Sequence, residues 1–153
     1  MTHIASATAT STAAPAAFFA KWADMATWPE WNADTEWVRL DGPFVQGATG
    51  TLKPAGGPKV SFEVATLTET EFVDVSRLPG GRLTFAHRVE VTPAGTEVSV
   101  SITLTGPLRW FWRKVMGADL AAGVGRDLDA LVGAAEALSA AGSLPARPEE
   151  VVR

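Results

Sequence analysis

The sequence contains no cysteine and no tyrosine, and its 153 residues include only two histidines. Without cysteine the chain forms no disulfide and has no thiolate nucleophile, which is typical of a reducing compartment. His3 and His87 are too few imidazoles for a multi-histidine zinc site, and no calcium-loop spacing occurs. The lack of tyrosine removes a phenol that could polarise a carbonyl group. We therefore expect neither a metal ion nor an organic cofactor.

Charge of one sign and long hydrophobic runs are also scarce. The formal net charge is −4 and the charges are interspersed, which predicts no basic surface for nucleic acid or anionic lipid. No run approaches 18 apolar residues, and no Lys or Arg precedes Lys21, so neither a membrane span nor a signal peptide is predicted. We expect a cytoplasmic monomer or homodimer without membrane insertion, and the abundance of Ala, Gly and Arg favours a bacterial source.

Two segments, 83–91 and 98–104, alternate strictly between apolar and polar residues. Alternation with a period of two predicts antiparallel strands with one dry face and one wet face. His87 is the polar exception on the dry side of the first segment, which it shares with Leu83, Phe85, Val89 and Val91.

Glycine and proline separate further segments that favour strands, and short loops of this kind join antiparallel neighbours. Two small helices are predicted between the first strand and the others, one capped by Thr12 and one beginning at Thr27 in a capping-box spacing. The additional strands are expected over residues 3–11, 35–40, 49–53, 60–67 and 72–77.

A long helix is predicted from Gly106-Pro107 to Ala141, which would span roughly 50 Å. Its apolar stripe changes direction by about 100–150° near three glycines, so we expect a bend or break there. The first part of that stripe comprises Leu108, Phe111, Trp112 and Val115, and the glycines are Gly117, Gly123 and Gly125. We expect one domain over residues 1–141 and a frayed tail over residues 142–153.

Several motifs lie within this pattern: Trp28-Pro29-Glu30-Trp31-Asn32, Val38-Arg39-Leu40-Asp41-Gly42, the glycine-rich stretch 47–57, Leu83-Thr84-Phe85-Ala86-His87-Arg88 and Leu104-Thr105-Gly106-Pro107-Leu108. With them the chain resembles the START-like (SRPBCC) superfamily and, within it, the polyketide cyclase/dehydrase-like group, over roughly residues 3–140. The resemblance implies an α+β helix-grip fold, in which a curved antiparallel sheet of about seven strands wraps around a long, bent C-terminal helix. It also implies a cavity between the sheet and that helix.

His87 is the candidate catalytic residue, because an imidazole on the inward register can carry a proton near neutral pH. The alternative is a core histidine that hydrogen-bonds to a neighbour. Arg77 would face inward only if Val73 and Val75 do, and we expect Asp74 and Glu63 in solvent. The candidate ligand-binding residues are Trp28, Trp31, Phe62, Arg77, Phe85, His87, Val100 and Trp112, with packing as the alternative role for Trp28 and Trp31.

Three functions remain open from the sequence. The first is a binding protein for a small hydrophobic molecule, which is aromatic, polyketide-like or lipid-like. The second is a cyclase or dehydratase that uses His87 as its proton carrier and needs no metal or organic cofactor. The third is a protein whose six tryptophans and seven phenylalanines fill the cavity, so that it acts through its surface.

Overall fold

The computed structural model describes residues 1–141, and the tail expected to fray (142–153) lies outside the described residues. Within residues 1–141, seven strands form one antiparallel sheet in the order β1-β7-β6-β5-β4-β3-β2. In chain order the elements are β1 (Thr2–Ser11), α1 (Pro15–Ala23), the 3₁₀ helix η1 (Met25–Glu30), β2 (Thr35–Leu40), β3 (Thr49–Pro54), β4 (Val60–Leu67), β5 (Glu71–Leu78), β6 (Gly81–Thr92), β7 (Gly95–Thr105) and α2 (Arg109–Ala140). This order confirms the helix-grip fold.

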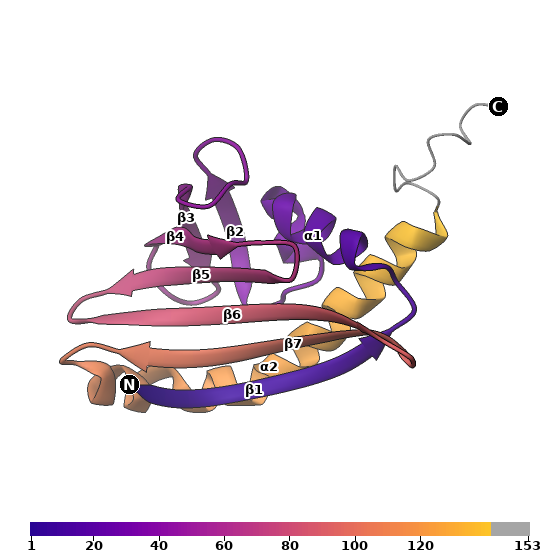
Figure 1. Ribbon diagram of the computed structural model, residues 1–153. Coiled ribbons are helices and arrows are strands. Elements are labelled where there is room, and N and C mark those ends of the chain that lie inside the picture. The colour runs from indigo at the N-terminus through magenta and orange to yellow at the C-terminus, as the bar shows by residue number, and fades with distance from the viewer. Residues whose placement is uncertain (142–153) are drawn as a thin grey trace.

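The strands β2 to β7 form a meander, and β1 returns to pair with β7 through registers such as Ala7 opposite Val100. The sheet curls, α2 runs beneath β6, β7 and β1, and α1 lies toward the far end of α2 (Figure 1). The inner face of the sheet is therefore covered by helices. The interior lies between these two layers.

Two groups of apolar side chains make up the core. The first gathers around α1 and η1 and includes Phe18, Trp22, Trp28, Phe72 and Leu131. The second lies nearer the start of α2, where Leu83, Ile102 and Leu104 pack against partly buried side chains that include Trp112, Met116 and Leu120. Val124 packs against both groups. We call them the α1 cluster and the β7 cluster.

A bend or break was predicted near the glycines of α2. The helix is continuous over 32 residues, so there is no break. Figure 1 shows the helix curving beneath the sheet. One stripe faces inward along its whole length, comprising Trp112, Met116, Leu120, Val124, Leu128, Leu131, Ala135 and Leu138. The apparent change of direction arose because Leu108, Phe111 and Val115 were counted as buried, whereas they are 47%, 54% and 55% exposed.

The predicted helix starts were also wrong in detail. The residue that caps α1 is Ala14, without a side-chain cap, and Pro15 opens the helix. The side chain of Ser11, and not that of the predicted cap Thr12, accepts a hydrogen bond at this turn, from the N–H of Ala13 at 3.0 Å. The Ser11 hydroxyl also donates to Glu136 Oε2 at 2.7 Å, which fastens the end of β1 to α2. The helix η1 begins at Met25, so Thr27 lies inside it rather than at its cap.

None of the helices in residues 1–141 combines the length and the hydropathy that a bilayer span requires.

Candidate ligand-binding site

Three polar side chains lie on the inner face of two neighbouring strands. Asp74 and Ser76 project from β5 and are 7% and 5% exposed, and His87 projects from β6. In the β5–β6 register His87 stands opposite Phe72, while Asp74 stands opposite Phe85. His87 and Asp74 are therefore diagonal neighbours on one face, a position that places side chains within reach of the same small molecule.

His87 is held in one tautomer by the backbone. Its Nδ1 lies 2.9 Å from the carbonyl oxygen of Phe72, which only accepts, so Nδ1 carries the proton and Nε2 is left as an acceptor. The ring stacks on Phe72 at 5.0 Å and 12° and lies 5.1 Å from the ring of Trp22. Burial lowers the pKa of His87 to about 4, against the smaller opposing effect of the Phe72 hydrogen bond. The imidazole is neutral at pH 7 and can accept a proton or a hydrogen bond.

Asp74 was expected in solvent and is buried instead. The alternation in β5 turns Phe72, Asp74 and Ser76 inward and leaves Val73 and Val75 on the outer face, half-buried. Burial raises the pKa of Asp74 from 3.8 to about 7. Within residues 1–141 no group hydrogen-bonds to its carboxyl, which leaves the group able both to donate and to accept near neutral pH.

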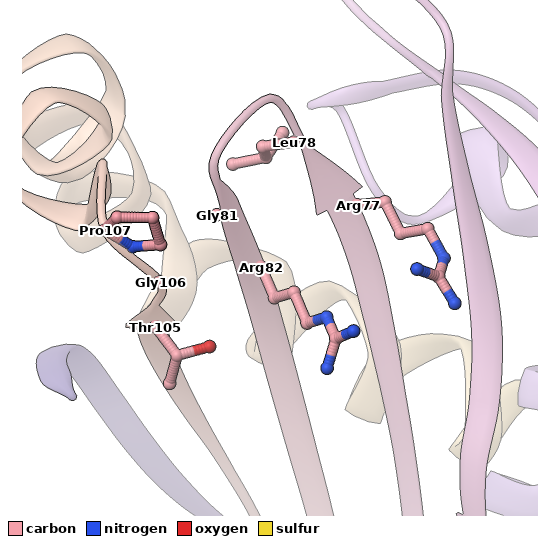
Figure 2. Close-up of a pocket in the computed structure, with 7 residues that line it drawn as sticks. All are labelled: Arg77, Leu78, Gly81, Arg82, Thr105, Gly106 and Pro107. Carbon is pink, nitrogen blue, oxygen red and sulfur yellow. The ribbon is translucent and has the colours of Figure 1, made fainter.

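Arg77 is not brought to this site. It follows Val73 and Val75 onto the outer face and lines an open pocket of about 540 Å³ at the end of the sheet. Arg82 stands directly opposite Arg77, and Figure 2 shows their side chains running alongside each other on neighbouring strands. This pocket lies beside the β5–β6 turn and the β7–α2 connection, away from His87.

The two tryptophans of the Trp28–Trp31 motif pack in the α1 cluster. Trp28 is 6% exposed, its ring lies 5.7 Å from that of Trp31, and its Nε1 donates to the carbonyl oxygens of Lys21 and Trp22. Trp22 was absent from the candidate residues although it contacts His87 directly. Its indole N–H is buried and has no acceptor within the described residues, and the same holds for Trp31.

The remaining candidates line the interior on both sides of the polar group. Phe62 and Val100 belong to the α1 cluster, and Phe85 and Trp112 pack in the β7 cluster. The Phe62 ring crosses Gly50, where a Cβ atom would lie 2.6 Å from Phe62 Cζ, so only glycine fits at that position. Asp74, Ser76 and His87 thus occupy the seam between the two clusters, which we call the polar seam.

Among residues 1–141, no three His, Asp or Glu side chains are grouped so that they could hold a metal ion.

A family model described as "Polyketide cyclase / dehydrase and lipid transport" matches residues 2–136. The chain belongs to this family. Membership confirms the resemblance inferred from the motifs and implies a cavity that binds hydrophobic ligands. No curated protein matches the sequence significantly.

Solved structures of similar shape support the fold. The di-domain ARO/CYC StfQ from the steffimycin biosynthetic pathway superposes with a TM-score of 0.72 at 14% identity, over 91% of this chain and 52% of that protein. The chain thus spans about half of the di-domain protein. A START superfamily protein from Mycobacterium smegmatis gives 0.65 at 16% identity over 89% and 99% of the two chains. A protein from Thermus thermophilus gives 0.65 at 18% over 88% and 98%. At these identities the likeness concerns the fold alone.

Proposed function

We propose that the protein binds a small hydrophobic molecule that carries oxygen atoms, and that this molecule occupies the polar seam. The observation that carries the proposal is unfilled hydrogen-bonding capacity on the inner face: the Trp22 indole N–H is fully buried without an acceptor, and the side chains of Asp74 and Ser76, 7% and 5% exposed, have no hydrogen-bond partner within the described residues. Leaving one such group unpaired costs about 1–3 kcal/mol. A bound ligand, with ordered water in its absence, would recover that free energy.

The chemistry of the seam defines the class of ligand. The Trp22 N–H and the protonated form of Asp74 donate, which suits a carbonyl oxygen, whereas His87 Nε2 accepts, which suits a hydroxyl group. Phe85 and Val100 supply apolar walls. Arg77 lies outside, and burial alone shifts the pKa of Asp74, so among residues 1–141 no cation stands beside this carboxyl to neutralise the carboxylate of a ligand. A neutral aromatic or polyketide-like molecule therefore fits better than a fatty acid anion, and its affinity would come mainly from buried apolar area.

A second function follows from the same residues, with roles that differ from the sequence prediction. A carboxyl that titrates near pH 7 is suited to donate and accept protons, whereas neutral His87 is a poor acid at that pH. In a cyclase or dehydratase reaction Asp74 would then carry the proton, and His87 would accept a hydrogen bond from the substrate. The cytoplasmic location and the monomeric or dimeric state stay predictions.

Binding can be tested with 2-naphthol, a neutral bicyclic phenol, by isothermal titration calorimetry. We expect Ser76→Trp, which fills the seam, to weaken binding more than tenfold, and Asp74→Ala to weaken it by a smaller factor. The matched controls lie on the outer face of the same region: Val75→Trp beside Ser76, and Glu63→Ala on β4. Equal losses in the controls would refute the site. Native mass spectrometry of the purified protein should show a co-purified small molecule.

Catalysis can be separated from binding with a synthetic poly-β-ketone as substrate. If Asp74 transfers the proton, Asp74→Asn should lower the rate of cyclisation by about 10²–10⁴ while substrate affinity stays within about tenfold. If the wild-type protein gives the same product distribution as the uncatalysed reaction, the enzyme hypothesis is refuted and the binding function remains.

A further inference from the structure

The first turns of α2 present apolar side chains to solvent. Trp110, Phe111 and Val115 are 58%, 54% and 55% exposed, and Leu108 immediately before the helix is 47% exposed. The opposite side of the same turns, with Trp112 and Met116, packs on the sheet. Phe111 is three residues from Leu108 and four from Val115, so these side chains adjoin along the helix. We call Leu108, Trp110, Phe111 and Val115 the α2 aromatic face. Exposed apolar patches of this kind mark interaction surfaces.

Two arginines flank this face, and further cations project from the outer face of the sheet at the same end of the molecule. The guanidinium carbons of Arg109 and Arg113 lie 5.3 Å and 5.9 Å from the ring centre of Trp110. Arg77 and Arg82 stand opposite each other at the same end of the sheet, an arrangement of like charges that destabilises a strand pair. Lys114 is exposed on the first turns of α2. Within the described chain, none of these five side chains forms an ion pair.

Carboxylates are scarce in the segments that build this end. Residues 75–89 and 98–118 contain no Asp or Glu, although the whole chain has a net charge of −4. Glu63 shares the outer face with Arg77, but it stands opposite Val75 and pairs with no cation of the described residues. The fold thus brings together basic residues that are interspersed along the sequence. From the sequence alone we expected no surface for anionic lipid.

This end of the molecule is built rigidly. The N–H of Leu108 donates to the carbonyl oxygen of Gly80 at 2.8 Å, and Trp112 Nε1 donates to that of Pro79 at 2.8 Å. These bonds fasten the start of α2 to the β5–β6 turn (Figure 1). Gly80 approaches Leu108 so closely that a Cβ atom would lie 2.5 Å from Leu108 Cδ1. The aromatic face is therefore held in place rather than exposed by fraying.

We propose that this end of the protein docks on an anionic lipid membrane, with Trp110 and Phe111 at the boundary between headgroups and acyl chains. Aromatic rings flanked by Arg and Lys are the side chains that settle at that boundary. Arg109, Arg113 and Lys114, on the same turns of α2, provide the complementary charge. Leu108 and Val115 add apolar area without polar atoms, which acyl chains accept without a matching shape. Such peripheral docking needs no membrane-spanning helix.

The test is cosedimentation with extruded vesicles of phosphatidylcholine mixed with phosphatidylglycerol, compared with pure phosphatidylcholine. We expect the wild-type protein to bind the anionic vesicles, and added salt to weaken binding by screening. Arg113→Gln with Lys114→Gln should lower the partition coefficient about thirtyfold, since each basic side chain near such a surface contributes on the order of fivefold. Trp110→Ala with Phe111→Ala should abolish sedimentation at the same lipid concentration.

Matched controls remove the same groups elsewhere. Lys21→Gln with Lys59→Gln deletes two cations on α1 and the β3–β4 connection, and Trp37→Ala deletes a tryptophan whose ring lies 6.0 Å from the Arg39 guanidinium carbon. These controls should bind vesicles within about twofold of wild type. Circular dichroism of every variant confirms that it is folded.

Several results would overturn the proposal. One is a failure to sediment with anionic vesicles. If the protein then binds soluble polyglutamate instead, the partner of this face is an acidic protein and not a membrane. Another is displacement from vesicles by inorganic phosphate at constant ionic strength, which would indicate a site for free phosphate. Equal losses in the controls are a third. Asp74→Ala should not affect vesicle binding, so this proposal and the ligand site fail independently.

Discussion

The tryptophans near α1 and those at the start of α2 differ in their surroundings. Trp22 and Trp28 are 1% and 6% exposed and lie against other rings, including Phe72. Trp110 is 58% exposed and lies between two arginines. The difference arises because α1 and η1 place these rings among other buried side chains, whereas α2 turns only one side of its first turns toward the sheet.

The comparison shows that one residue type serves two purposes in one small domain. Within the α1 cluster, tryptophan contributes buried apolar area and, at Trp22, a buried indole N–H without an acceptor in the described residues. On the α2 aromatic face, it contributes a ring that neighbouring cations stabilise in solvent. The first region is suited to hold a neutral molecule inside, and the second to contact an anionic surface outside.

The largest expected effect contrasts the stabilities of two tryptophan variants. Trp22→Ala should lower the free energy of unfolding by about 3–5 kcal/mol, because it leaves a cavity among well-packed rings. Trp110→Ala should change it by no more than about 0.5 kcal/mol, since the ring contributes little buried area. Urea denaturation of both variants measures the difference. Similar losses in the two variants would show that the α2 aromatic face is packed and not exposed.

The pH dependence of stability sharpens the description of the inner region. Asp74 retains its proton on folding between about pH 4 and 7, so its contribution destabilises the fold as pH rises through that window. His87 gives up its proton on folding between about pH 4 and 6.5, so its contribution stabilises the fold as pH rises. The two slopes oppose each other, each at up to about 1.4 kcal/mol per pH unit.

Removing one of the two groups should therefore leave the pH dependence of stability that the other group contributes. Relative to wild type, Asp74→Asn should gain stability progressively as pH rises from about 4 to 7, and His87→Gln should gain stability as pH falls from about 6.5 to 4. Urea denaturation across this range measures both. Asp127, whose pKa burial also raises to about 7, titrates in every variant and cancels in the differences. Parallel profiles would mean that neither group is buried as described.

The smallest effect concerns the hydrogen bond that fastens the start of α2 to the β5–β6 turn. Trp112→Phe keeps the apolar ring in the β7 cluster but removes the hydrogen bond to the Pro79 carbonyl oxygen, at a cost of about 0.5–1.5 kcal/mol. Trp110→Phe removes an exposed indole and should cost less than about 0.5 kcal/mol. Thermal unfolding of the pair measures the contrast. A neutral Trp112→Phe would mean that the start of α2 is held by its backbone bonds alone.

Much of the fold was predictable from local patterns. The strands predicted over residues 35–40 and 60–67 match β2 and β4, and the motifs identified the family that the comparisons confirm. His87 was placed correctly on the inward register because strict alternation in β6 leaves no other choice. The aromatic ring on which it stacks, and the carbonyl oxygen that fixes its tautomer, come from a different strand and were not predictable.

Asp74 shows why the rest of the site was not predictable. In β5 the half-buried valines Val73 and Val75 alternate with Asp74 and Ser76, so hydrophobicity favoured the wrong face. The register with β6 settles the matter by placing Asp74 opposite inward-facing Phe85. Because side chains alternate along β5, the same register places Arg77 on the outer face.

The sequence by itself determined the architecture, because turn residues and periodicity act between near neighbours in the chain. It also determined that any chemistry here works without thiols or phenols, since composition does not depend on folding. Only the tertiary structure decided which carboxyl is buried, which tryptophans meet solvent and where the unpaired cations gather. Those outcomes depend on contacts between strands and helices far apart in sequence, and the inward and outward faces of each element exist only after those contacts form.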